Sequence, residues 1–485
     1  MKKNSSLQMV GNIDFDKYVN QYAESYPCFK ILRIYASFYG QRSKQIQFGP
    51  TDKDVSSYYS LFIGKNGVGK SSLFREILDF FVLAQKGAKS TEKETIRIRQ
   101  VDYVLNGNIY KILRNGNVFE YTKNHRKVEK DYVEFPLIIA CSMGMFDKFP
   151  VNSINKPDRK SRYDIDSYRY VGPKANSNMF TSKTNILVNT LSLIGTHMSW
   201  EQKKKIKSVL NHIGYKGIIS YEFYINSNKS YYTVNQQSST EWMDSRTSDY
   251  FSANQDRKPV KYDLNLEVLN QDLESPVSFY EINQLKQHGF TKSFKCYFYT
   301  NNNEQVNCDN MSSGEFNLLI LTLNILLAPY NKSLLILLDE PEISQHPNWQ
   351  LDFLDILDKG LKEYKSHIFI ATHSHFLVSN LPLGRSRVVN MERDDNGIID
   401  IKYLQSETYG WSAEEVLLKV FKMGTDRSIF LAKTVGDFLV SIGNDSIPVE
   451  EVKAKLVFLD QVSTYLSDVD PMKKVITSII KEFNS

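Results

Sequence analysis

The chain has 485 residues, a hydrophobic content of 41% and a formal net charge of +5, which fits a globular protein of roughly two to four lobes. The mild charge permits a nucleic-acid partner without indicating one. No apolar run of about 18 residues occurs, and none follows the N-terminal Met-Lys-Lys, so we expect neither membrane spanning nor secretion. The four cysteines, Cys28, Cys141, Cys296 and Cys308, form no CxxC pair, which argues against a zinc ribbon or disulfide framework and favours a cytoplasmic location.

Two short segments near the start of the chain, 30–34 and 44–48, alternate between apolar and polar residues. This alternation predicts a pair of antiparallel strands. They lead towards a third, apolar strand that ends at Ile63. We therefore expect the chain to enter an α/β sheet through an antiparallel pair.

A glycine-rich loop follows that strand, and a helical pattern follows the loop. Residues 64–71 fit the pattern G-x-x-x-x-G-K-[ST], in which backbone N–H groups and a helix N-terminus surround an anion. Lys70 is predicted to reach the β- and γ-phosphates of a nucleotide, and the Ser71 hydroxyl to bind Mg²⁺. The alternative is a chance match in a flexible loop, against which the flanking strand and helix argue. The predicted phosphate-binding residues are Gly64, Lys65, Asn66, Gly67, Val68, Gly69, Lys70, Ser71 and Ser72.

Strand-like runs continue between residues 95 and 119. Asn-Gly pairs at Asn106 and Asn115 separate them, which predicts hairpin turns and a β-meander. The apolar run at 135–141 is typical of a strand buried on both faces.

The composition changes between residues 151 and 285, where the sequence is polar and rich in Tyr and Asn. We interpret this part as an inserted lobe, with helices at 183–194 and 200–213. Its basic residues are candidates for contact with phosphate backbones, but a solvated surface is the preferred interpretation because acidic residues are interspersed. These basic residues are Lys156, Arg159, Lys160, Arg162, Lys203, Lys204, Lys205 and Lys207.

Apolar elements return at Met311. The segment 311–315 precedes an apolar helix at 318–327, and an apolar strand at 334–338 ends in two adjacent carboxylates. Asp339 and Glu340 therefore lie where α/β sheets place their ligand sites. Two carboxylates after a strand can also be an ordinary strand end.

The two carboxylates are predicted to have different roles. Asp339 is the candidate to bind Mg²⁺ through its hydration shell, opposite Ser71, and Glu340 is the candidate general base for an attacking water. A helix at 348–363 leads to another buried strand, after which His373 is placed to hydrogen-bond a γ-phosphate. A lone histidine at this place is more often a satisfied strand-end residue.

The tail from residue 411 has a helical pattern. Ser412 with Glu415 forms a capping box, and Asp470 with Pro471 begins a last helix. The apolar faces of these helices require a partner surface, which is the chain's own body by default and a second copy or another protein as the next alternative.

Four of these segments resemble, in order, the Walker A, signature, Walker B and switch-histidine motifs of ABC-type ATPases: 64–71, 311–315, 339–342 and 372–374. The Asn-Gly pair inside the loop and the Asp-Glu-Pro-Glu sequence are similar to the RecF, SMC and OLD branch. The resemblance covers roughly residues 28–150 and 280–390. It implies an α/β fold, a P-loop NTPase of ABC-ATPase type with an antiparallel β subsheet, an inserted α+β lobe and a helical C-terminal tail. The predicted segments are 1–150 and 286–410 for the two ATPase parts, 151–285 for the lobe and 411–485 for the tail.

The resemblance also implies ATP and Mg²⁺ as cofactors and a catalytic set of Lys70, Glu340 and His373. In such ATPases the signature turn of one subunit covers the nucleotide of another, so a homodimer or higher oligomer with composite ATP sites is expected. Glu315 replaces the Gln that is usual in transporters. The usual Q-loop glutamine is absent from 142–150, and slow or regulatory hydrolysis is expected. The signature residues implied to contact the γ-phosphate in trans are Ser312, Ser313, Gly314 and Glu315.

Within this branch the chain lacks the long heptad arms of a full SMC protein. The segment beyond residue 380 is expected to be short and helical and not to form the Toprim domain of an OLD nuclease. The short lobe, segments 146–150 and 170–173 and the tail look like the PtuA-type ATPase of Septu and retron-associated anti-phage systems. This implies a sensor or regulator of a separately encoded HNH nuclease, because the eight histidines here build no HNH site. DNA or RNA, including a retron non-coding RNA, is a further possible partner.

Three alternatives stay open at this point. One is a RecF- or SMC-like DNA-repair ATPase that binds duplex DNA. Another is a PARIS-like defence ATPase with a Toprim effector. A transporter nucleotide-binding subunit is disfavoured by the long insert.

Overall fold

The computed structural model divides the chain into two compact units, Met1–Trp411 and Ser412–Ser485. The residues that it describes are 29–37, 44–48, 57–87, 97–144, 147–151, 162–176, 179–191, 193, 198–225, 259–267, 282, 286, 290–329, 332–394, 396–404, 406–421, 429–443, 449–466 and 470–484.

A seven-stranded sheet forms the centre of the first unit. Its neighbours are parallel, except that the edge strand β19 runs antiparallel to β18. Every residue of the inner strands β3, β17, β16 and β8 is buried, which explains their continuous apolar sequences. The strand order is β19 (Ile399–Tyr403), β18 (Ser386–Arg393), β3 (Ser57–Ile63), β17 (Ser366–Ala371), β16 (Leu334–Asp339), β8 (Leu137–Ser142) and β9 (Tyr168–Val171).

The register of this sheet brings the strand ends together. Asp339 at the end of β16 pairs with Ala371 of β17 on one side and Ser142 of β8 on the other. Ala371 in turn pairs with Phe62 of β3, two residues before the phosphate loop begins at Gly64. The carboxyl ends of four parallel strands therefore meet at one edge, where such sheets bind their ligands.

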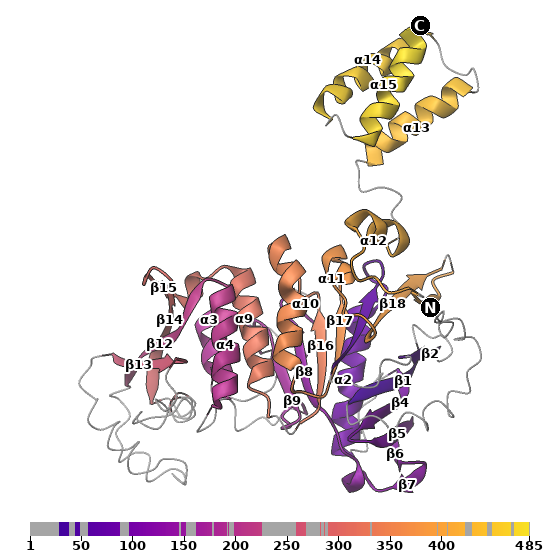
Figure 1. The fold of residues 1–485 in the computed structure, drawn as a ribbon. Helices are drawn as coiled ribbons and strands as arrows, with labels where there is room; N and C mark the ends of the chain where they lie inside the picture. Colours follow the sequence, from indigo (N-terminus) through magenta and orange to yellow (C-terminus); the bar gives the residue numbers. More distant parts are fainter. Residues whose placement is uncertain are drawn as a thin grey trace, which may run out of the picture. The chain divides into compact units, whose positions relative to one another are not determined.

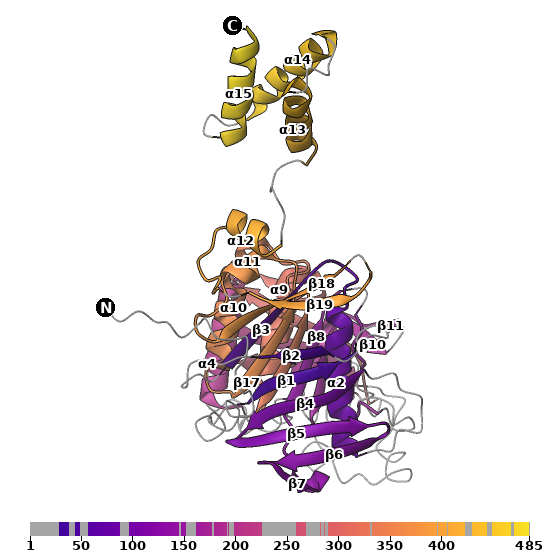
Figure 2. The same ribbon diagram turned by 90° about the vertical axis from the view of Figure 1, so that its right-hand side faces the viewer.

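A second, antiparallel sheet packs over one face of the first. The predicted strand pair and β-meander are both confirmed here, and β1 joins the meander through β4. Helix α2 (Lys70–Lys86) lies between the two sheets (Figures 1 and 2), and its phenylalanines share one apolar core with both. The strand order is β2 (Lys44–Gln47), β1 (Lys30–Ala36), β4 (Ile98–Leu105), β5 (Asn108–Asn115), β6 (Val118–Lys123) and β7 (Arg126–Val128).

Of the two predicted hairpin turns, the first lies where it was predicted and the second does not. Asn106 and Gly107 form the first turn, both with positive φ, as their sequence predicts. The second turn lies one residue later than predicted, because Asn115 pairs with Val118 and still belongs to β5. A short 3₁₀ helix, η1 (Lys130–Tyr132), follows the meander.

Helices cover the other face of the seven-stranded sheet (Figure 1). The apolar helix α9 (Ser313–Leu326) packs against α3 (Lys183–Leu191), α4 (Trp200–His212) and α10 (Pro347–Leu361). The helices predicted within the lobe are confirmed, with small differences at their ends. Short elements complete the unit: β10 (Lys174–Asn176), β11 (Met179–Phe180), η3 (Cys308–Asn310) and α11 (His375–Ser379).

The inserted lobe contains its own antiparallel sheet, and this sheet crosses the predicted boundary between 285 and 286. Strands β14 and β15 lie after that boundary, but β14 pairs with β12, which lies before it and also pairs with β13. At the other end, β9 lies after residue 150 but belongs to the central sheet. The strand order in the lobe is β13 (Val260–Asn265), β12 (Tyr215–Ile225), β14 (Thr291–Thr300) and β15 (Gln305–Asn307).

The basic run on α4 is largely paired with acidic residues. Lys204, Lys205 and Lys207 form ion pairs with Glu201, Glu363 and Glu267, and Lys203 is fully buried. This arrangement matches the solvated-surface interpretation for the three exposed or half-buried lysines. Lys156, Arg159 and Lys160 of the other basic run lie outside the described residues.

The expectation of a helical segment beyond residue 380 is wrong for residues 386–403. Strands β18 and β19 occupy it, and β18 adds a parallel neighbour to β3. The apolar residues Val388, Val389 and Met391 are buried by this pairing. A partner strand more than 300 positions away decided the conformation, and no local pattern revealed it.

The second unit is helical, as predicted. Val435, Phe438, Leu459, Ile476 and Ile479 form its buried core. Ser412 caps the first helix by accepting a hydrogen bond from the backbone of Glu415. The helices are α12 (Ala413–Lys419), α13 (Ile429–Gly443), α14 (Val449–Tyr465) and α15 (Pro471–Asn484). With the sheets and lobe above, the predicted fold class is confirmed. Across the described residues of both units, no helix combines the length and apolar character needed to cross a membrane.

Candidate active site

The phosphate loop connects the end of β3 to the start of α2. Gly64 has φ 143°, and a Cβ there would lie 2.2 Å from the carbonyl oxygen of Met391 in β18. Gly69 is the N-cap of α2 with φ 109° and supplies no side-chain cap. Because no side chain caps α2, the N–H groups of its first turn are left to the pocket in front of it.

Lys70 is buried and makes two hydrogen bonds through its ammonium group. Its Nζ donates to the carbonyl oxygen of Gly64 at 2.8 Å and lies 2.9 Å from Nε2 of His373. Burial lowers the pKa of Lys70, and the carboxylates of Glu340, Asp339 and Glu342 oppose this effect. Three acidic side chains thus act electrostatically on one cation.

Ser71, in the first turn of α2, and Asp339, at the end of β16, meet at one point. The Ser71 hydroxyl donates to Oδ1 of Asp339 at 2.8 Å. Burial raises the pKa of Asp339 to about 6, and the Ser71 hydrogen bond only partly offsets this. The Asp339 carboxylate is buried beside a hydroxyl and, among the described residues, is not neutralised by a paired cation. Such a pair of oxygen atoms suits Mg²⁺, a hard cation that prefers oxygen ligands.

Glu340 points differently from Asp339 because its backbone is left-handed. Its φ is 51°, an uncommon value for a residue with a side chain, and its N–H donates to the carbonyl oxygen of Ala371 at 2.8 Å. Its carboxylate lies 3.7 Å from Nε2 of His373 and is 37% exposed. Glu340 therefore faces the open pocket while Asp339 is buried.

Glu342 and Thr372 fix the position of His373. Oε1 of Glu342 accepts hydrogen bonds from the Thr372 hydroxyl at 2.6 Å and the His373 N–H at 2.8 Å. Both residues lie within the motifs recognised in the sequence, but no role was predicted for either. The spacing of Glu342 two residues after Glu340 was the signal that could have identified it.

A pocket of ≈ 380 Å³ lies between the loop and the strand ends. Gly64, Lys65 and Val68 do not line it: Gly64 contributes its carbonyl to Lys70, Lys65 is exposed, and Val68 is buried beneath the loop. Five further lining residues were not predicted: Ser142 at the end of β8, Gly144, Asp147 and Lys148 after it, and Ile343 after β16. The lining consists of Asn66, Gly67, Gly69, Lys70, Ser71, Ser72, Ser142, Gly144, Asp147, Lys148, Asp339, Glu340 and Ile343.

The signature turn lies outside this pocket. None of Ser312, Ser313, Gly314 and Glu315 is among the lining residues. The helix begins at Ser313, not at 318 as predicted, because Ser312 and Glu315 form a capping box: the Glu315 N–H donates to Oγ of Ser312 at 3.2 Å, and the Ser312 N–H to Oε2 of Glu315 at 2.9 Å.

Gly314 allows the signature turn to pack closely on the segment after β16. A Cβ at this position would lie 2.7 Å from the carbonyl oxygen of Ser344 and 2.9 Å from the ring of Trp349. Tyr215 of the lobe donates to Glu315 at 3.4 Å. The signature turn is thus held between the lobe on one side and the turn after β16 with the start of α10 on the other.

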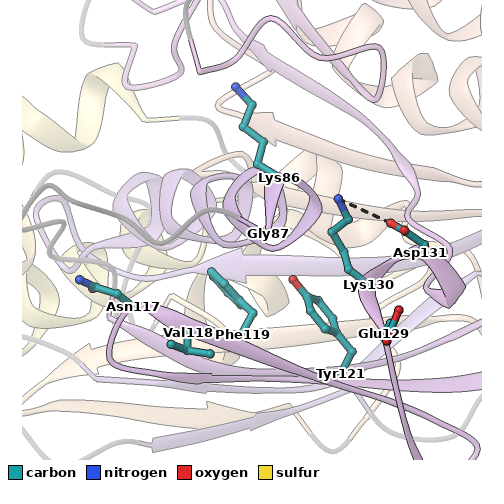
Figure 3. A pocket seen from close by; sticks show the side chains of 9 residues that line it. All are labelled: Lys86, Gly87, Asn117, Val118, Phe119, Tyr121, Glu129, Lys130 and Asp131. Atoms are coloured by element: carbon teal, nitrogen blue, oxygen red, sulfur yellow. Dashed lines mark ion pairs between the residues drawn. The ribbon is translucent and has the colours of Figure 1, made fainter.

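A second pocket, of ≈ 400 Å³, lies at the opposite end of α2 (Figure 3). The ring of Tyr121 rises from β6 towards α2, and its hydroxyl donates to the carbonyl oxygen of Ala84. Lys130 and Asp131 pair at its rim at 3.7 Å. No predicted site residue lines this pocket.

Comparison with curated proteins gave no match. Among solved structures, the chain is similar to an Smc head bound to the C-winged helix domain of ScpA (11% identity, TM-score 0.36), to an Smc head with an extended coiled coil bound to the C-terminal domain of ScpA derived from Pyrococcus furiosus (12%, 0.33), and to the SMC head domain from Thermotoga maritima (13%, 0.36). Each match covers 78% of this chain and 98%, 96% and 99% of the other chain, respectively. At these TM-scores the likeness carries no argument.

The family comparison is decisive. The sequence matches the family described as AAA ATPase domain over residues 45–378, more than half of the chain. That stretch includes the phosphate loop, the signature turn and both strand ends of the pocket. The chain therefore belongs to the AAA ATPase domain family.

Proposed function

We propose that the protein binds ATP with Mg²⁺ and hydrolyses it slowly, at sites completed by a second copy of the chain. The observation that carries this proposal is the convergence of Ser71 and Asp339 at 2.8 Å in a pocket that also contains Lys70 and Glu340. A loop for phosphate, two oxygen ligands and a separate carboxylate are the parts that phosphoryl transfer to water requires.

The residues have distinct roles in this proposal. Lys70 donates to phosphate oxygens, and Ser71 with Asp339 would hold Mg²⁺, which supplies charge neutralisation and alignment of the phosphates. Glu340 accepts a proton from the attacking water, for which its exposed carboxylate is suited. His373, fixed by Glu342, hydrogen-bonds the terminal phosphate.

A second copy of the chain is part of the proposal because the signature turn does not line the pocket of its own chain. Ser312 and Ser313 are exposed at the N-terminus of α9, where backbone N–H groups favour an anion. In the proposed assembly these residues, with Gly314 and Glu315, cover the γ-phosphate held by the partner copy. ATP then joins two copies, and hydrolysis separates or rearranges them.

At a finer level, we propose a sensor or regulator in anti-phage defence, of the PtuA type, that acts in the cytoplasm and controls a separately encoded HNH nuclease. The support is the resemblance of the ordered motifs, the short lobe and the helical tail. Co-purification of the chain with the product of its neighbouring gene, in the presence and absence of ATP, tests this level. ATP-stimulated, salt-dependent binding of duplex DNA by the isolated chain would instead favour the DNA-repair alternative.

The ATP site itself is tested by equilibrium binding of ATP and Mg²⁺ to the full chain. Lys70→Ala should weaken binding by about 100-fold or more, because it removes a buried charge-assisted donor. Lys127→Ala is the matched control, since Lys127 is 79% exposed on the meander. Equal ATP affinity in Lys70→Ala and the control would refute the proposed site.

A further inference from the structure

The segment after β8 places a lysine at the phosphate loop. Lys148 is exposed, lines the pocket, and donates from Nζ to Oγ of Ser72 at 2.8 Å. Ser72 belongs to the first turn of α2, which contains no acidic residue. Lys148 therefore adds a second positive group where the helix already favours anions.

The ammonium of Lys148 has capacity for more partners. It carries three N–H donors, and the Ser72 hydroxyl accepts one of them. No ion pair of Lys148 is found among the described residues. An anion between Lys148 and the start of α2 would meet both the remaining donors and the helix N–H groups.

The backbone of Lys148 is held in place from both sides. Arg75 of α2 donates to the Lys148 carbonyl oxygen. The neighbouring Asp147 has a fully buried carboxylate that accepts from the Tyr170 hydroxyl at 2.6 Å and pairs with Lys174 at 3.5 Å. These contacts hold the backbone of Lys148 in place before a ligand binds. The entropic cost of ordering this residue on binding is therefore lower.

The charges in the pocket also favour a further cation beside Lys70 and the proposed Mg²⁺. The carboxylates of Asp339, Glu340 and Glu342 all act on the ammonium of Lys70. A triphosphate adds several more negative charges to the same place. Lys70 and Mg²⁺ together offset only part of this negative charge, and Lys148 reaches it from a different element.

We propose that Lys148 is a second phosphate-binding residue of this site, with Asp147 as the residue that positions it. This rests on the ATP binding proposed above. Lys148 gives up the Ser72 hydroxyl and donates to phosphate oxygens of the nucleotide. Since Asp147 holds Tyr170 and Lys174, the same segment connects the phosphates to the strands that lead into the inserted lobe.

The test compares Lys148→Gln and Lys148→Arg with Lys127→Gln as the charge-matched control. Binding of ATP and of inorganic tripolyphosphate, which has no base or sugar, is measured on the full chain. Lys148→Gln should weaken both ligands by about tenfold or more, Lys148→Arg should stay within about threefold, and Lys127→Gln should match the wild type.

Each outcome has a separate meaning. Wild-type ATP affinity in Lys148→Gln overturns the assignment of Lys148 and leaves the ATP site intact. Weaker binding of ATP with unchanged binding of tripolyphosphate overturns it as well, because the lysine would then not contact phosphate. Failure of the wild type to bind either ligand overturns the proposed function together with this inference. Melting curves of the variants that match the wild type exclude misfolding as the cause of a loss.

Discussion

The ammonium of Lys70 and the imidazole of His373 are hydrogen-bonded at 2.9 Å, which connects the phosphate loop after β3 to the turn after β17. An ammonium group can only donate, so Nε2 of His373 accepts and the ring is neutral, with its proton on Nδ1. Burial and the charge of Lys70 both lower the pKa of His373, in agreement with a neutral ring.

This pairing predicts the effect of His373→Ala. Turnover should fall by about tenfold or more, because the imidazole that contacts Lys70 and, in the proposed site, the terminal phosphate is lost. ATP affinity should change by less than about threefold, since Lys70 keeps its bond to Gly64 and remains in place. Steady-state kinetics with separate binding measurements decide this, and equal losses in both quantities would contradict the assigned role.

Glu340→Gln should keep ATP binding and stop hydrolysis. The amide retains the shape of the carboxylate but cannot accept the proton of the attacking water. ATP should then hold the variant in its assembled form, visible as a larger mass by light scattering with ATP than with ADP. Glu120→Gln, on the meander, is the control and should behave as the wild type. A loss of ATP affinity equal to that of Lys70→Ala would argue against a role as general base.

Asp339→Asn should stabilise the fold while it abolishes Mg²⁺-dependent hydrolysis. Burial raises the pKa of Asp339 in the folded chain to about 6, above the ordinary value of 3.8 for an aspartate. Because the pKa of Asp339 is raised by folding, its protonated side chain favours the folded state below about pH 4, and this contribution is lost as the pH rises through 6. At pH 8 the ionised carboxylate therefore lowers the free energy of unfolding by on the order of 2–3 kcal/mol.

Thermal unfolding without Mg²⁺ measures this effect. The variant should melt at a higher temperature than the wild type at pH 8, and the difference should shrink towards pH 4. Asp131→Asn, at a position whose side chain is 83% exposed, should show no such difference. A less stable Asp339→Asn at pH 8 would show that Asp339 is favourably paired, contrary to the account.

Gly314→Ala tests the packing of the signature turn. The added Cβ would lie 2.7 Å from the backbone oxygen of Ser344, in the turn that follows β16. We expect a loss of about 1–3 kcal/mol in stability and lower turnover. Gly436→Ala in α13 meets no atom within 4 Å and should be neutral or slightly stabilising. Similar melting temperatures for both variants would contradict the close packing.

The parts of the site that the sequence predicted share a common property. The phosphate loop, Asp339 and His373 each stand directly after an apolar strand, and parallel strands end at one edge, so local patterns sufficed to bring them together. The position of Ser312 as a helix cap was also readable from Glu315 three residues later, although the helix was predicted to start at 318.

The parts that were missed depend on distant partners. Strand β18, which covers Gly64 through Met391, forms only because β3 lies beside it. The lobe boundary shifted because β14 pairs with β12 across a long stretch of sequence. Lys148 joins the pocket through the buried contacts of Asp147 with Tyr170, which no spacing within one segment encodes.

The central claim is that ATP is held by the loop of one copy and covered by the signature turn of another, and a mixing experiment tests it most directly. Lys70→Ala and Ser313→Arg are purified separately, each inactive alone, and then combined in equal amounts. If two copies share each site, half of the dimers are mixed and carry one intact site, so ATPase activity should return to about a quarter of the wild type. Activity that stays at the level of the separate variants, while the mixed dimers are shown to form, would contradict the account.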